Sequence, residues 1–204
     1  MRLIRWETLL DRPDARFEPY RERLFTDIRL AVEAVIWPPG SADSIIRPES
    51  GKERGKGNGV KPIKKAFINR LEVRGWIPEK DFPRVSPEFR PPGPFDSFFT
   101  VPEAPPFVAE WETGNVSSSH RAVNKIVLGI QDGGLTGGVL VVPTRHLARY
   151  LTDRIGNYEE LEPYFRLWSR SCDRGYLAII GVEHDNESTE VPRIAKGTDG
   201  RALL

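Results

Sequence analysis

The sequence has very little sulfur and almost no net charge. Its one cysteine, Cys172, excludes an internal disulfide and fits a reducing cytoplasm. The formal net charge is +1, so overall basicity does not indicate nucleic-acid binding, which would need locally clustered cations. Apolar runs are too short to span a membrane, and charge at Arg2 and Arg5 predicts that no signal peptide is present. These features predict a cytoplasmic protein without a membrane partner.

In its other features the amino-acid composition is typical of a folded chain. It has 204 residues, of which 39% are hydrophobic and 29% are charged. A chain of this length buries one substantial core, so we expect residues 1–204 to form a single domain. The segment from about residue 183 to residue 204 is polar with scattered glycines, and it predicts a flexible tail.

Hydrophobic periodicity predicts an α/β protein. Apolar residues at spacings of three and four predict helices over residues 18–37, 61–75, 145–154 and 158–170, and one from Ser117 or Ser118 to Gly133. Apolar runs predict strands over residues 107–112, 138–143 and 176–182. Strand, helix and strand over residues 107–142 make a βαβ unit. Residues 78–94, rich in proline and charge, predict an irregular connection or a peripheral hairpin.

Three acidic residues are the candidate catalytic and metal-binding site. Side chains alternate along a strand, so Glu110 and Glu112 share one face, and a hairpin over residues 95–112 would bring Asp96 beside them. Converging carboxylates repel one another unless a cation lies among them, and oxygen ligands favour Mg²⁺. The alternative is that the two glutamates form a solvated outer face of the strand.

Two stretches are candidates for binding phosphate groups of a nucleic acid. In residues 51–59 three cations alternate with four glycines, which describes either an arm that folds onto a phosphate backbone or a flexible solvated loop. Polar residues near the start of the helix after residue 115 suit a phosphate oxygen, or are ordinary surface residues. The candidate DNA-binding residues are Lys52, Arg54, Lys56, Lys61, Asn115, Ser117, Ser118, His120 and Arg121. Zinc at His120 is not expected, because no second histidine or cysteine lies at ligand spacing from it.

A family resemblance adds to these residue patterns. The stretch from Lys64 to Trp76 resembles the "F…LE.RGW" helix of type II restriction endonucleases of the BglII/BstYI group. The run from Gly138 to Pro143, followed by Tyr158-Glu159-Glu160, is similar to the central strand of that group and its sequel. The ordered agreement covers roughly residues 60–182. It implies a restriction-endonuclease core of the PD-(D/E)xK superfamily, with a mixed central sheet flanked by helices.

The resemblance also assigns roles to the acids. By position, Asp96 and Glu110 would be the two acids of the motif. Glu112 would stand where most of the superfamily has lysine, BglII and BstYI have glutamine and BamHI has glutamate. The resemblance implies a homodimer that binds double-stranded DNA and is held together partly by the helices at about 118–131 and 145–154. It also implies one or two Mg²⁺ per subunit. A GATC-centred target is typical of the group. Because Glu112 provides no fixed cation, a second ion is favoured.

Other functions are compatible with the same sequence. A DNA-binding protein of this fold without cleavage, or a structure-dependent repair nuclease, would share most of these residues. Glu72 in the helix over residues 61–75 could face the carboxylates, although the helical pattern favours a surface position.

Overall fold

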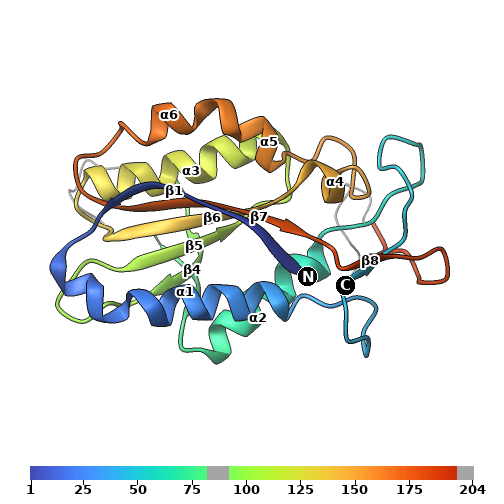
Figure 1. Cartoon of the computed structure of the whole chain (residues 1–204), viewed down its shortest axis with the longest axis horizontal. Helices are drawn as coiled ribbons and strands as arrows, with labels where there is room; N and C mark the ends of the chain where they lie inside the picture. The colour runs from blue at the N-terminus through green and yellow to red at the C-terminus, as the bar shows by residue number, and fades with distance from the viewer. Residues whose placement is uncertain (82–91, 197–204) are drawn as a thin grey trace.

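A six-stranded mixed sheet forms the centre of the protein, seen here in a computed structural model that describes residues 1–81 and 92–196 (Figure 1). Three central strands are parallel, and the strands outside them are antiparallel to their neighbours. In spatial order the strands are β1 (Arg2–Arg12), β7 (Gly175–Glu183), β6 (Gly137–Pro143), β5 (Phe107–Trp111), β4 (Phe95–Phe99) and β3 (Ile77–Lys80). The predicted α/β class with a mixed sheet flanked by helices is confirmed.

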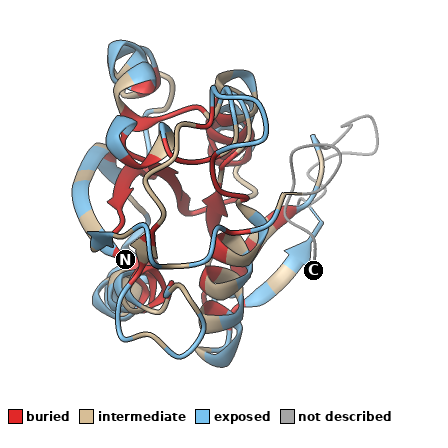
Figure 2. Ribbon diagram, turned by 90° about the vertical axis from the view of Figure 1, so that its right-hand side faces the viewer, coloured by how far each residue is buried: buried red, intermediate tan, exposed pale blue. Residues whose placement is uncertain are grey.

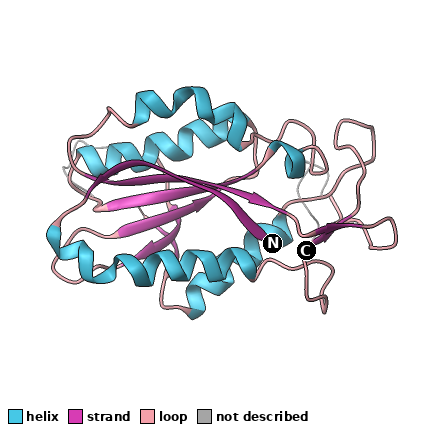
Figure 3. Cartoon of the chain, in the orientation of Figure 1, coloured by secondary structure: helices cyan, strands magenta, loops and turns pink. Residues whose placement is uncertain are grey.

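Helices cover both faces of the sheet (Figures 1 and 3). The helices of one face are α1 (Glu18–Glu33), preceded by the 3₁₀ turn η1 (Ala15–Phe17), and α2 (Lys61–Val73). The helices of the other face are α3 (Val116–Gln131), α5 (Tyr158–Leu161) and α6 (Phe165–Trp168), the last two joined by the 3₁₀ turn η2 (Glu162–Tyr164). The short helix α4 (Arg145–Ala148) follows β6 at one end of the sheet. There β2 (Ile45–Ile46) and β8 (Asn186–Glu187) pair in parallel.

Alternation along β5 divides the core into two layers. Phe107, Ala109 and Trp111 pack with α1 and α2 in the first layer. Val108 packs with the apolar side of α3, including Val123 and Ile126, in the second. Figure 2 shows buried strands at the centre of the protein, and β5, β6 and β7 are buried along their whole length. The predicted βαβ unit is present as β5, α3 and β6, with β5 and β6 parallel.

The helices after β6 are shorter than the sequence pattern predicts. The helix expected over residues 145–154 is the four-residue α4, because the chain beyond it extends to pair Leu151 with Asn58. The helix expected over residues 158–170 is divided into α5, η2 and α6. Pro163 lies in the 3₁₀ turn, where it has no N–H to continue an α-helical ladder.

The start of α3 also differs from the prediction. The N-cap is Asn115, whose side chain accepts a hydrogen bond from the backbone N–H of Ser118, and not Ser117 or Ser118 themselves. An asparagine at this position serves as well as serine, so the residue type alone did not decide where the helix begins.

The prediction of a poorly ordered tail is wrong for residues 183–196. Ile194 is 1% exposed and its backbone N–H donates to the Asn58 side chain at 3.2 Å. The polar composition of this segment concealed one apolar anchor. Residues 197–204 of the predicted tail, and residues 82–91 of the predicted irregular connection, lie outside the described residues. The part of that connection before residue 81 is the edge strand β3, which pairs with β4.

Replacing Ile194 by alanine tests whether this segment is part of the folded core. We expect Ile194→Ala to lower the free energy of unfolding by about 2–4 kcal/mol, because it leaves a cavity where a buried side chain packed. Urea denaturation measures the change. The control Val73→Ala, at a side chain that is 77% exposed, should change stability by less than about 0.5 kcal/mol. Equal stability of the Ile194 variant and the wild type would show that the segment does not contribute.

Candidate active site

A pocket of about 320 Å³ opens where β4, β5 and the start of α3 meet. All three candidate acids contribute to its wall. The remaining lining residues are Lys64 of α2, Pro92, Gly93 and Pro94 before β4, and Ser118, Arg121, Ala122 and Lys125 of α3. The β4–β5 hairpin therefore brings Asp96 beside the glutamates, as the sequence predicts.

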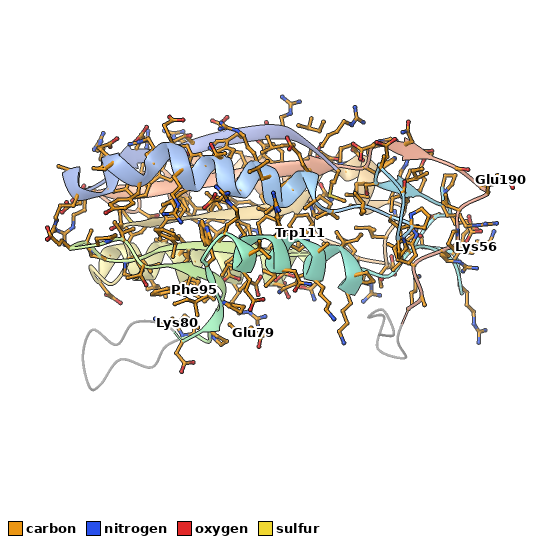
Figure 4. All side chains as sticks on the ribbon, turned by 90° about the horizontal axis from the view of Figure 1, so that it is seen from below. Lys56, Glu79, Lys80, Phe95, Trp111 and Glu190 are labelled. Atoms are coloured by element: carbon orange, nitrogen blue, oxygen red, sulfur yellow. The ribbon has the colours of Figure 1, made fainter. Side chains whose placement is uncertain are left out.

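Asp96 is held at the edge of the hairpin by two contacts. One carboxylate oxygen accepts the backbone N–H of Trp111 at 2.9 Å, and the other pairs with the Lys64 ammonium at 2.7 Å. Trp111 is fixed in turn by its packing against Phe67 of α2, with ring centroids 4.9 Å apart. Figure 4 shows Trp111 next to α2, and Phe95, which precedes Asp96, belongs to the neighbouring strand β4. The carboxylate is thus positioned by both the sheet and a helix.

Glu110 is the most deeply buried acid of the three. It is 5% exposed, and its carboxylate pairs with the Lys125 ammonium at 2.6 Å. Burial, together with repulsion from Asp96, raises the pKa of Glu110 to about 7, although the nearby lysines act against this shift. Lys125 is itself 8% exposed and also donates to the carbonyl oxygen of Pro94 at 2.6 Å. A strongly perturbed carboxyl group in a pocket is a mark of functional sites.

Glu112 lies just beyond the end of β5. Its Oε1 accepts the backbone N–H of Gly114 at 2.5 Å. A Cβ atom at residue 114 would lie 2.7 Å from the same oxygen, so the glycine lets the backbone approach the carboxylate closely. The Glu112 carboxylate is therefore turned back toward the start of α3.

The predicted phosphate-binding residues of α3 have different surroundings. Ser118 and Arg121 line the pocket. Asn115 and Ser117 are exposed at the start of the helix. His120 points elsewhere, since its ring packs against Tyr164 at 4.5 Å and against Trp168 at 5.3 Å between centroids. Its contacts are aromatic, on the side of α3 covered by η2 and α6.

The glycine-rich stretch is docked against the chain that follows α4. The backbone N–H of Gly51 donates to Arg149 O at 2.9 Å, and that of Asn58 to Tyr150 O at 2.7 Å. A Cβ atom at residue 51 would lie 1.7 Å from the carbonyl oxygen of Leu151, so only glycine allows this approach. The glycines are thus explained by close packing, whereas the neighbouring cations are exposed: Lys52, Arg54, Lys56 and Lys61.

Lys52 belongs to a second pocket, also of about 320 Å³. Three arginines share this pocket with it, and the acids Asp153 and Glu160 also line it. The arginines are Arg145, Arg149 and Arg154. Arg54, Lys56 and Lys61 are in the lining of neither pocket, and Glu72 is exposed on α2 outside both.

Two charged residues that line the pocket of the three acids were not among the sequence candidates: Lys64 and Lys125. A signal for Lys125 exists in the helical periodicity, because residues 118, 121, 122 and 125 lie on one side of a helix. Ser118 and Arg121, at the first two of these positions, were predicted to bind DNA, and the same side of the helix extends to Lys125. Lys64 lies on α2, whose approach to Asp96 depends on tertiary packing.

Comparison of the sequence with known families gives a match over nearly its whole length. The family model for "Restriction endonuclease BamHI" matches residues 1–201. The chain belongs to the BamHI family of restriction endonucleases. Its function is therefore that of a type II restriction endonuclease.

Two curated relatives belong to the same class of enzyme. The type II restriction enzyme OkrAI of Oceanobacter kriegii is 42% identical over 204 residues, which cover 100% of both chains. The type II restriction enzyme BamHI of Bacillus amyloliquefaciens is 34% identical over 183 residues, covering 88% of this chain and 82% of that enzyme. The resemblance to a BamHI-like group is confirmed by these similarities.

A solved structure shares the fold. The restriction endonuclease BglII, in a complex with a DNA 16-mer, superposes with a TM-score of 0.57 at 10% identity, covering 92% of this chain and 79% of that one. At this identity the similarity concerns the fold alone. Among the helices of residues 1–81 and 92–196, none is long and apolar enough to cross a membrane.

The raised pKa of Glu110 predicts how stability depends on pH. Between pH 4.5 and 7 the folded chain holds a proton on this carboxyl group that the unfolded chain has lost, so this contribution to stability decreases as pH rises through 7. Glu110→Gln removes the contribution. We therefore expect the free energy of unfolding of the variant, measured relative to that of the wild type, to increase by about 2.5 kcal/mol when the pH is raised from 5 to 8.

Urea denaturation in EDTA at the two pH values measures this difference, because contributions from titrating groups that do not interact with Glu110 cancel between wild type and variant. The same pH dependence in both proteins would contradict the raised pKa.

Proposed function

We propose that this BamHI-family enzyme hydrolyses phosphodiester bonds of double-stranded DNA with a divalent metal ion, Mg²⁺, at a GATC-centred palindrome. The observation that carries the metal-dependent mechanism is the pocket in which Asp96, Glu110 and Glu112 converge beside the start of α3. The GATC-centred target rests on the resemblance to the BglII/BstYI group, and the choice of duplex DNA is supported by the DNA-bound restriction enzyme with the same fold.

The pocket has the donors that a hard divalent cation requires. Its three acids offer only oxygen ligands, which Mg²⁺ prefers. Their negative charge already attracts cations within the chain, since Lys64 pairs with Asp96 and Lys125 with Glu110. A metal ion would take over this compensation from the ammonium groups. The acids therefore fit a metal site of one or two ions per subunit.

Each acid has a proposed role. When bound, the divalent ion polarises the scissile phosphate and lowers the pKa of a coordinated water. Asp96 and Glu110 would hold the ion, because both carboxylates are positioned at the edge of the hairpin. Glu112, at the end of the strand, orients the attacking water and accepts its proton.

Lys125 adds a cation that Glu112 does not provide. In most of the PD-(D/E)xK superfamily a lysine stands at the position of Glu112. Here the Lys125 ammonium reaches Glu110 from α3, and a guanidinium, that of Arg121, lines the same pocket. We propose that Lys125, released from Glu110 on metal binding, stabilises negative charge that develops on the phosphate. With Lys125 in this role the pocket has a fixed cation, so a second metal ion is less necessary for stabilising the charge on the phosphate.

The DNA backbone is proposed to contact cations around both pockets. Lys52 lies with Arg145 and Arg149 in the second pocket, and Ser118 and Arg121 lie in the first, so phosphates could be bound in both pockets. Arg54, Lys56, Lys61, Asn115 and Ser117 are exposed and remain proposed DNA contacts, whereas the aromatic packing of His120 argues against a direct one.

We propose that the enzyme acts as a homodimer, with one active site per subunit and single-domain subunits. A palindromic target has two-fold symmetry, which a symmetric dimer matches. The proposed contact between subunits through α3 has less of that helix available, because η2 and α6 pack against His120 and Asn124. Exposed apolar residues such as Leu128 remain available on α3.

Isosteric replacement of the acids tests the proposed active site. Asp96→Asn and Glu110→Gln should each lower the rate of plasmid cleavage in Mg²⁺ by at least about a thousandfold, because a neutral amide holds the ion poorly. Binding of the same DNA in Ca²⁺ should remain. Glu72→Gln serves as a matched control, since its exposed carboxylate is outside the pocket, and it should cut at close to the wild-type rate.

Sequencing the ends of the fragments identifies the target. A single GATC-centred sequence at every end supports the proposal. A gel shift without cutting would indicate a binding protein, and degradation of branched substrates would indicate a repair nuclease. Cleavage by Glu110→Gln at the wild-type rate would exclude the assigned site.

Replacement of Glu112 by lysine tests the charge balance of the pocket. Three cations, Lys64, Arg121 and Lys125, already line it, so a fourth would compete with the metal ion. We expect Glu112→Lys to lower the cleavage rate by at least about a hundredfold, and by more than Glu112→Gln does. Single-turnover rates in Mg²⁺ compare the two variants. Appreciable cleavage by the lysine variant would contradict the proposal.

A further inference from the structure

Two histidines and two glutamates meet beyond the carboxyl ends of β6 and β7, in a group called here the histidine–glutamate cluster. Its members come from separate elements: His146 from α4, Glu183 from the last position of β7, His184 directly after it, and Glu187 from β8. One ligand atom each of His146, Glu183 and His184 lies within 4.8 Å of the other two. The two imidazole rings are 5.0 Å apart between centroids.

Each glutamate of the cluster contacts the same ring nitrogen of both histidines. Both Nδ1 atoms face Glu183, with His184 at 2.5 Å from Oε1 and His146 at 3.3 Å from Oε2. Both Nε2 atoms face Oε1 of Glu187, at 3.1 Å from His146 and 3.2 Å from His184. One glutamate therefore lies on the Nδ1 side of both rings and the other on the Nε2 side.

Hydroxyl groups fix the two carboxylates. Thr144 donates its hydroxyl hydrogen to Glu183, and Tyr150 donates to Glu187 at 3.1 Å. Among the described residues, the ion-pair partners of both glutamates are the two histidines, with no lysine or arginine at salt-bridge distance. Glu183 and His184 are 7% and 3% exposed, so both side chains are shielded from solvent. With neutral imidazoles, buried carboxylate charge is left without a cation.

We propose that the histidine–glutamate cluster binds a transition-metal ion of the zinc class. His146 and His184 provide Nδ1, Glu183 provides a carboxylate oxygen, and Glu187 accepts the Nε2–H groups of both ligating rings. Two imidazoles and one carboxylate are a ligand set of zinc sites, and a carboxylate behind a ligating histidine is its usual support. Tetrahedral zinc with bonds of about 2.1 Å places ligand atoms about 3.4 Å apart, so small side-chain rotations suffice.

The cluster is a different site from the pocket of the three acids. Both lie at the carboxyl edge of the parallel strands, but the acids end β5 and the cluster ends β7, with β6 between them. Strands about 4.8 Å apart separate the two by roughly 10 Å. The donors also differ, because nitrogen ligands favour zinc over Mg²⁺. His146 is half exposed and gives an ion access from solvent.

A bound ion would connect α4, β7 and β8. It would thereby stabilise the chain around α4, which leads to Arg149 and the docked glycine-rich stretch. The expected effect is structural, and it does not depend on the proposed cleavage mechanism.

Zinc binding to the untagged, metal-stripped protein tests the proposal. We expect one high-affinity Zn²⁺ per chain by equilibrium dialysis, an increase of Tm with Zn²⁺, and the intense visible absorption of tetrahedral cobalt when Co²⁺ replaces it. His146→Gln should weaken Zn²⁺ binding by at least about tenfold and abolish the absorption, since one ligand is lost. His184→Asn should do the same, with circular dichroism to check its folding.

Two controls separate the possible sites. His120→Gln changes the third histidine of the chain, which packs on aromatic rings, and should keep Zn²⁺ binding. Asp96→Asn should keep it as well, because that residue belongs to the pocket of the three acids. The proposal is overturned if Zn²⁺ does not bind stoichiometrically, or if binding is lost in Asp96→Asn and retained in His146→Gln. Because none of these readouts measures cleavage, their failure leaves the proposed active site untouched.

Discussion

Carboxylate charge buried at the carboxyl edge of the sheet is the constraint on which the rest of this structure depends. Glu110 is 5% exposed near the carboxyl end of β5, and Glu183 is 7% exposed at the carboxyl end of the parallel strand β7. Removing a carboxylate from water costs several kcal/mol unless a cation and further hydrogen bonds compensate it. The elements around the sheet supply these partners: Lys125 from α3 for the first glutamate, and two imidazoles for the second.

The mixed topology makes this arrangement possible. Parallel β5, β6 and β7 all end at one edge, so their polar termini gather there while their central residues form the core. The antiparallel strand β4 then adds Asp96 from the other direction, because its side chain accepts the N–H of Trp111 near the end of β5. A purely parallel sheet would have carried that acid at the far end. The sheet thus determines how the acids meet, and the helices determine their counter-charges.

The sequence predicted those features that local patterns control. The apolar run of β6, the alternation along β5 and the stripe of α3 each follow from a period of two or 3.6, and the structure has all three. Asp96, Glu110 and Glu112 were found because a strand and a hairpin relate them. Lys64 was not, because its contact with Asp96 joins α2 to β4 and has no periodic signature.

Three other features were not predicted, for related reasons. β1 is an edge strand with many charged, exposed residues, which suits an edge but hides the pattern of a strand. Ile194 belongs to a segment that is mostly polar, so composition predicted disorder where one buried side chain anchors the segment. His146 and His184 are far apart in the sequence, and only the packing of α4 against the end of β7 brings them together.

The contact between Gly51 and Leu151 has a thermodynamic consequence for binding. Gly57 approaches the same carbonyl oxygen, so two backbone segments are joined by hydrogen bonds before any partner arrives. The loss of conformational entropy in the cation-bearing stretch between them is thereby incurred largely during folding. A polyanion that meets this surface orders less of the chain, and more of the electrostatic attraction is retained as affinity.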